Sequence, residues 1–192
     1  MSELARGVYR YWRDGQLQAI TEPWRLLAAP GGLLLRGKRL VDGLPFLDVE
    51  ADYVGTRCTG LRLHWQPPAP AAPRSVEYQL REGGLLRWRF EHEAGFRELA
   101  LPADALLFPL LRAGTGPLLG ALSSGARNVV LPCIRDGADA ASFLHPIHSP
   151  RHVSAPVQVG DGSPTLRYHG GEYGAEGCDC WLDDHGLLQR YH

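Results

Sequence analysis

The chain has few of the features that assign a protein to a membrane or to nucleic acid. Its 192 residues include no apolar run of about 18 residues, the length that a membrane-spanning helix needs. The longest apolar stretch, residues 105–111, is far shorter and contains Pro109. The formal net charge is −1, so no overall field draws the protein to nucleic acid or to an anionic membrane. We therefore expect neither a membrane-spanning protein nor a nucleic-acid partner.

The first residues also lack an apolar segment. Charges at Glu3, Arg6 and Arg10 interrupt them, which is unlike a signal peptide or an anchor. We therefore expect a cytoplasmic protein whose four cysteines are reduced. A bridge between Cys178 and Cys180 would close a very small, strained ring, so both are predicted to be free thiols.

Short segments in which apolar and charged residues alternate are frequent. Leu61, Leu63 and Trp65 alternate with Arg62 and His64, and similar runs follow elsewhere. Side chains in a strand change face at every residue, so each run predicts a strand with one buried and one wet face. Such strands are typical of an antiparallel sheet covered on one side. The predicted strands are 7–13, 16–28, 33–41, 45–54, 59–66, 75–82, 85–92, 127–135, 165–169, 178–183 and 187–192.

Glycine-containing turns separate these runs. Asp14-Gly15, Asp42-Gly43 and Gly83-Gly84 provide the positive φ angles that tight hairpins require. The proline-rich segment 66–73 predicts an extended surface loop, with strands of the same type continuing beyond it. A further loop, rich in histidine and proline, is predicted over 143–156.

The alternation stops at Leu101-Pro102. Thr115 as the N-cap, Pro117 in the first turn and Gly125 as the stop predict a short helix, within a helical insertion of about 103–123. We therefore predict a mainly β fold: one domain, 1–192, with a single curled antiparallel sheet, as a β-roll or half-barrel, and one short helical insertion.

No segment predicts a specific catalytic or cofactor site. His145, His148 and His152 resemble a zinc-binding spacing, but Pro146 and Pro150 prevent the helix that would place the rings on one face. The chain also lacks a nucleophile elbow and a phosphate-binding loop. We therefore expect no bound metal, no cofactor and no catalytic residues. An enzyme with a site at the mouth of the roll, near His145, His148 and Arg151, remains an alternative.

The C-terminal block carries a resemblance to a known family. It consists of Leu166–His169, then Cys178–Asp183 ending in Asp, then a Gly-Leu turn and a last strand ending in Tyr191. With the segment 108–112 before it, this order resembles the bacterial glycolipid-binding family, whose members form a spiral β-roll. More distantly it resembles the half-barrel lipoprotein carriers. The resemblance implies a lipid-like ligand and no catalytic residues.

The predicted function is therefore non-catalytic binding or carriage of an apolar or amphipathic molecule in the concave face of the sheet. Burying each large apolar side chain is worth roughly 1.5–3 kcal/mol, so the aromatic face must be covered. Arg112 is predicted to lie near an opening and to pair with an anionic head. The other predicted ligand-binding residues are Trp65, Tyr78, Trp88, Phe90, Phe108, Leu111 and Leu118. A partner-binding protein with a filled core and no pocket remains the other alternative.

Overall fold

The structure is a computed structural model that describes residues 1–66, 72–125, 128–134, 143–155, 165–170 and 176–191. The chain divides into two compact units, Met1–Leu101 and Pro102–His192. The prediction of a single domain therefore stays a prediction. Within the described residues, no helix is long and apolar enough to cross a membrane.

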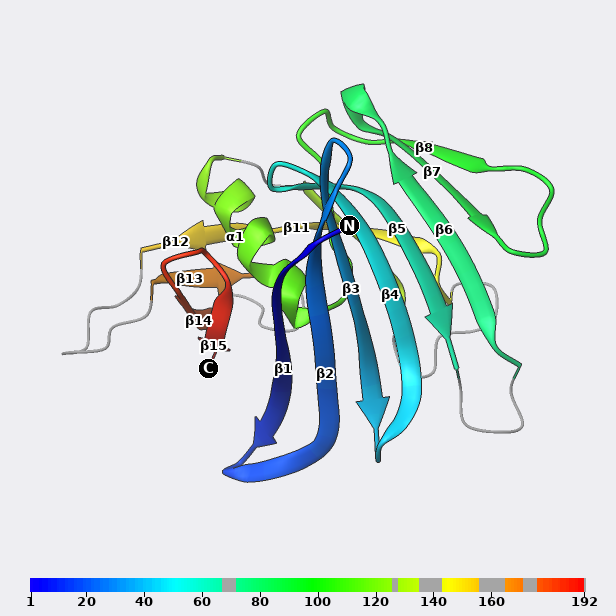
Figure 1. Cartoon of the computed structure of the whole chain (residues 1–192). Coiled ribbons are helices and arrows are strands. Elements are labelled where there is room, and N and C mark those ends of the chain that lie inside the picture. Colours follow the sequence, from blue (N-terminus) through cyan, green and yellow to red (C-terminus); the bar gives the residue numbers. More distant parts are fainter. Residues whose placement is uncertain (67–71, 126–127, 135–142, 156–164, 171–175, 192) are drawn as a thin grey trace. The chain divides into compact units, whose positions relative to one another are not determined.

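The first unit is one antiparallel sheet of eight strands in sequential order, coloured blue to green in Figure 1. Each strand pairs with the next along the chain. The predicted loop 66–73, between the fifth and sixth strands, lies largely outside the described residues. A short 3₁₀ turn, Glu82–Gly84, precedes β7. The strands are β1 (Glu3–Arg13), β2 (Gln16–Ala29), β3 (Gly32–Val41), β4 (Leu44–Val54), β5 (Arg57–Trp65), β6 (Arg74–Leu80), β7 (Leu85–Phe90) and β8 (Arg97–Ala100).

The predicted hairpin turns are confirmed by their backbone angles. Asp14 and Gly15 have φ of 50° and 74°, and Asp42 and Gly43 have φ of 53° and 77°. Two successive positive φ values give a turn whose twist matches that of the flanking strands. The Asp-Gly pairs therefore set the registers in which β1 pairs with β2 and β3 pairs with β4. In these registers the apolar side chains of neighbouring strands share one face of the sheet.

The two faces of this sheet differ in polarity, as the alternation predicts. On β4, Leu47, Val49 and Ala51 are buried, whereas Asp48 and Glu50 between them are half-buried. The same division continues on β5 and β6. One face is therefore apolar and buried, and the opposite face carries the charged side chains.

Pro23 interrupts the ladder in an interior strand. The pairing of β2 with β3 is present at Thr21 and resumes at Trp24. Proline has no backbone N–H to donate to a neighbouring strand, which explains the interruption. β2 nevertheless continues as one strand from Gln16 to Ala29, which confirms the strand predicted over 16–28.

The second unit contains two smaller sheets and the helix. The first sheet has the order β11-β10-β9, in which β9 and β10 are parallel, and the second has the order β12-β13-β14-β15. The helix α1 spans Thr115–Ser123 and follows a 3₁₀ turn, Arg112–Gly114. The strands are β9 (Leu106–Leu107), β10 (Asn128–Pro132), β11 (Pro146–Pro150), β12 (His152–Ser154), β13 (Leu166–His169), β14 (Cys178–Leu182) and β15 (Leu188–Tyr191).

The mainly β, antiparallel fold with one short helix is confirmed, with the strands divided among several sheets. Other predictions need correction. The 3₁₀ turn leads directly into α1, so Gly114 is the N-cap and Thr115 already has helical angles, with φ −69° and ψ −41°. Part of the predicted loop 143–156 forms β11 and β12, because β10 pairs with β11 from Asn128↔Pro150 to Pro132↔Pro146. Both prolines are terminal residues of β11, where the absent N–H costs least.

Candidate ligand-binding site

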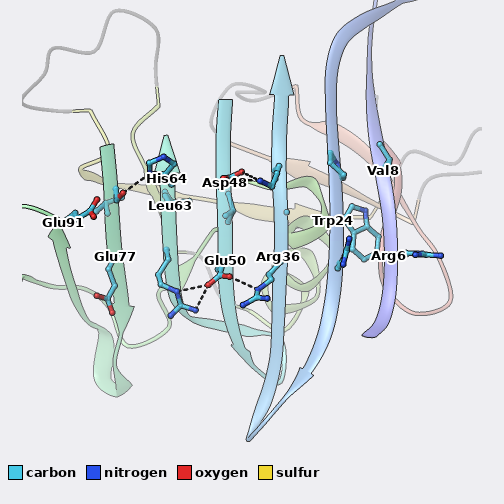
Figure 2. Close-up of a pocket in the computed structure, with 18 of the residues that line it drawn as sticks. Arg6, Val8, Trp24, Arg36, Asp48, Glu50, Leu63, His64, Glu77 and Glu91 are labelled. Atoms are coloured by element: carbon cyan, nitrogen blue, oxygen red, sulfur yellow. Dashed lines mark hydrogen bonds and ion pairs between the residues drawn. The ribbon is translucent and has the colours of Figure 1, made fainter. Parts of the chain in front are cut away.

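A hollow of about 1240 Å³ lies on the charged face of the eight-stranded sheet. Its walls come from the first seven strands, and Figure 2 shows their side chains. Because side chains at alternate positions share a face, the lining side chains form rows that run across the sheet. The charged lining residues are Arg6, Arg25, Arg36, Lys38, Asp48, Glu50, Arg62, Glu77, Arg89 and Glu91.

One row consists of arginine and glutamate in direct cross-strand register from β3 to β7. Glu50 lies between two arginines, with Arg36 Nε 2.7 Å from Oε1 and Arg62 Nη2 3.1 Å from Oε2. Figure 2 shows this carboxylate held from both sides. Further along, Arg89 Nη2 lies 3.0 Å from Oε2 of Glu77. Opposite charges at directly opposed positions stabilise neighbouring strands, and both glutamates of this part of the row are ion-paired.

The adjacent row is more mixed. Lys38 Nζ lies 3.3 Å from Oδ1 of Asp48. Next in register, His64 Nδ1 is 2.9 Å from the hydroxyl of Ser75. At the other end of this row the side chains are apolar, because Val8 is opposed by Pro23. The hollow therefore combines charged, neutral polar and apolar groups.

The environment of Glu77 shifts its titration. Partial burial raises its pKa, but hydrogen bonds from Gln79 and Arg89 and the charges of Arg89 and Arg62 lower it, so that the pKa lies below its ordinary value. Glu77 is therefore an anion at neutral pH.

The predicted aromatic ligand residues of the first unit share the opposite, apolar face. Tyr78 is directly opposed by Trp88, and Phe90 by Val76. Tyr78 is fully buried and Phe90 is 6% exposed. Trp65 lies at the end of β5, opposed by Arg74. None of the four lines the hollow, which lies on the other face of the sheet.

The remaining predicted ligand residues lie in the second unit. Leu118 belongs to a buried cluster with Leu106, Leu122 and Val129, and Phe108 packs against it. Leu111 is 1% exposed. Arg112 places its guanidinium 4.3 Å from the ring centroid of Tyr191. Because these residues and the aromatic face belong to different units, a single site that contains them all stays a prediction.

The predicted histidines His148 and His152 lie in different environments in the second unit. His148 Nε2 lies 2.9 Å from Oδ1 of Asn128, whose Nδ2 donates to Asp104 at 2.8 Å. In this chain of contacts His148 donates through Nε2 and its Nδ1 is left as the acceptor in the neutral ring. His152 instead stacks on His169, with centroids 4.5 Å apart. These residues do not line the hollow.

Arg151, which was predicted with His145 and His148 for an alternative enzyme site, places its guanidinium carbon 5.7 Å from the ring centroid of Tyr168. His145 contributes its backbone carbonyl to the N–H of Cys133. In the part of the chain that the structure describes, no three His, Cys, Asp or Glu side chains are grouped so that they could hold a metal ion.

All four cysteines are buried free thiols. Burial raises the pKa of the Cys58 thiol, with the nearby Asp52 carboxylate as a second cause. A hydrogen bond with Cys178, and then burial, raise the pKa of Cys180. The thiols of Cys58 and Cys180 are therefore held in the protonated form and are poor nucleophiles.

A buried acid on the apolar face, Glu22, is not among the residues predicted from the sequence. Glu22 is 1% exposed and its Oε1 accepts a hydrogen bond from the Tyr11 hydroxyl at 2.6 Å. Arg39 donates to the same oxygen from Nε at 2.7 Å. A signal was present, because Glu22 shares the alternation phase of Ile20 and Trp24 within a predicted strand. Its partner Arg39 could not be identified without the register.

No family model, no curated protein and no solved structure matches this chain. The resemblance to a glycolipid-binding family therefore stays a prediction.

Proposed function

We propose that the protein binds an amphipathic small molecule, without catalysis, in the hollow of the charged face of the eight-stranded sheet. The observation that carries this proposal is the size and lining of the hollow, about 1240 Å³ across seven strands. Binding sites for small molecules are concave and combine apolar surface with a few placed polar groups.

The lining supports an amphipathic ligand because charged and apolar surface are adjacent. Val8 is 56% exposed and is directly opposed by Pro23. Two residues away on the same face lie Arg6 on β1 and Arg25 on β2. An apolar chain on Val8 and Pro23 would remove their surface from water, and the polar part of the ligand would meet the charged rows.

This proposal keeps the ligand class predicted from the sequence and changes its position. The sequence analysis placed the ligand on the apolar face, where Tyr78 is fully buried. The charged face offers open surface instead. We also propose that binding takes place in the cytoplasm, which four buried, unbridged thiols support.

The test is a titration with 11-(dansylamino)undecanoic acid, whose fluorescence rises in an apolar environment. Saturable binding to the folded chain is expected. The variant Val8→Asn should weaken binding about tenfold, as expected when a buried apolar contact is lost. Leu4→Asn is the matched control, because Leu4 lies on the same strand, is also 56% exposed and is not part of the lining.

A second pair of variants tests the centre of the hollow. Ser75→Trp would fill the space beside His64 and should abolish binding. Gln79→Trp changes the same face of β6 outside the lining and should leave binding intact. The proposal is wrong if no amphiphile binds saturably, or if both tryptophan variants affect binding equally.

A further inference from the structure

We propose that the ligand's polar part is an oxyanion, a carboxylate or a phosphate, held by the arginines at the β1–β3 end of the hollow. This inference rests on the proposed function and specifies the chemistry of the ligand at the same site. It is carried by the order of charges across the sheet.

The charged row becomes purely cationic toward the edge strand. Arg6 is directly opposed by Arg25, and Arg25 in turn by Arg36. From Arg36 onward the row alternates, with Glu50 opposite Arg36 and Arg62 opposite Glu50. Like charges at directly opposed positions destabilise neighbouring strands. An anion bound between these three opposed arginines would therefore reduce the repulsion between them.

The carboxylate nearest to this end satisfies the arginines only weakly. Glu3 lies 3.7 Å from Nε of Arg6 and 3.9 Å from Nε of Arg25, both beyond hydrogen-bonding distance. The Arg6 and Arg25 side chains are 77% and 68% exposed. In Figure 2 the Arg6 side chain extends outward from the edge strand. Both guanidinium groups can therefore rotate onto an incoming ligand.

The lining as a whole carries an excess of positive charge. Six cationic side chains face four carboxylates, while the complete chain has a net charge of −1. The excess is concentrated at Arg6 and Arg25, because Asp48, Glu50 and Glu77 are paired with cations farther along the sheet. The local field at this end therefore favours an anion although the protein as a whole does not.

The geometry of the arginine side chain limits the chemical class of the ligand further. Its planar guanidinium presents parallel N–H donors that match the two oxygens of a carboxylate or phosphate. The exposed apolar pair Val8 and Pro23 lies next to these donors on the same face. An oxyanion attached to an apolar chain fits both features at once.

The experiment compares four amphiphiles that share a twelve-carbon apolar chain and differ in their polar headgroup. Binding of dodecanoate, dodecyl phosphate, dodecyl trimethylammonium and monododecanoyl glycerol is measured by displacement of the dansyl probe below their micellar concentrations. The two anionic amphiphiles should bind about tenfold or more tightly than the neutral and cationic ones, and added salt should reduce this preference.

The position of the anion is tested with Arg25→Gln. This variant should weaken binding of the anionic amphiphiles about tenfold and leave the neutral glyceride unchanged. Arg10→Gln is the matched control, because Arg10 is exposed on the same face of β1 and lies outside the lining. Inorganic phosphate alone, titrated by calorimetry, distinguishes a free oxyanion from an amphiphile.

The outcomes separate the two proposals. Equal binding of all four heads, or no effect of Arg25→Gln on the anionic ones, overturns the oxyanion site but leaves the amphiphile-binding function in place. Phosphate binding that is lost in Arg25→Gln, with no amphiphile bound, supports the oxyanion site and overturns the amphiphile function. No binding of any probe overturns both.

Discussion

Glu22 allows a direct test of the energetics of the apolar face. The perturbation is Glu22→Ala, which removes the carboxylate that accepts hydrogen bonds from Tyr11 and Arg39. The Arg39 guanidinium, whose side chain is 17% exposed, would then be left without its partner Glu22. Removing one member of a buried ion pair costs about 3–5 kcal/mol, because the remaining charge is desolvated without compensation. We therefore expect the free energy of unfolding to fall by about that amount.

The assay is urea unfolding followed by tryptophan fluorescence, supported by thermal unfolding. A loss of this size corresponds to a fall in Tm of about 6–20 °C for a chain of this length. Tyr11→Phe removes one hydrogen bond to the charged oxygen and should cost about 1.5–3 kcal/mol. The control is the pair formed by the exposed Glu98 and the half-buried Arg87, in which Oε1 and Nε lie 3.0 Å apart, and Glu98→Ala should cost at most about 1 kcal/mol.

The expected loss comes from the charge of Arg39 once its partner Glu22 is removed, and a double variant tests this cause. Glu22→Leu with Arg39→Met removes both charges and keeps similar volumes, so most of the stability should return. Equal losses for Glu22→Ala and Glu98→Ala would refute the reasoning. A double variant no more stable than Glu22→Ala would show that packing, and not the charge, causes the loss.

Three further predictions concern single sites. A Cβ at Gly116 would lie 2.0 Å from the backbone oxygen of Gly186, so Gly116→Ala should destabilise the protein in urea unfolding. A Cβ at Gly120 would meet, outside its chain neighbours and the backbone of its own helix, no atom of the described residues within 4 Å, so Gly120→Ala should stabilise the protein by about 0.5–1 kcal/mol. The Tyr53 hydroxyl is buried and has no hydrogen-bond partner among the described residues, so Tyr53→Phe should raise the free energy of unfolding by about 1 kcal/mol. A fall in the free energy of unfolding would contradict this. The fold lowers the pKa of Glu77, so its contribution to stability is present above its unfolded pKa of about 4.3 and is lost as the pH falls through the lower folded value. Glu77→Gln should therefore reduce the dependence of the free energy of unfolding on pH at acid pH. An unchanged slope would contradict the lowered pKa of Glu77.

Local patterns were sufficient to predict most of the eight-stranded sheet. The alternation on β4 identified both the strand and its buried face, because side-chain direction in a strand depends only on position along it. The Asp14-Gly15 turn was predictable for a similar reason, since a positive φ is a local requirement. β8, by contrast, was missed because its four residues are all exposed and carry no alternation of burial.

The tertiary structure alone decided which side chains meet across strands. Glu22 and Arg39 are 17 residues apart, and only the pairing of β2 with β3 brings them together. The cationic end of the hollow likewise depends on the register that opposes Arg6, Arg25 and Arg36. A sequence shows the period of each strand, but a shift of register would realign every charge with a different partner. The sequence alone therefore predicted that one face of the sheet is charged. Strand pairing decided the order of the charges across that face, and this order distinguishes ion-paired side chains from a candidate anion site.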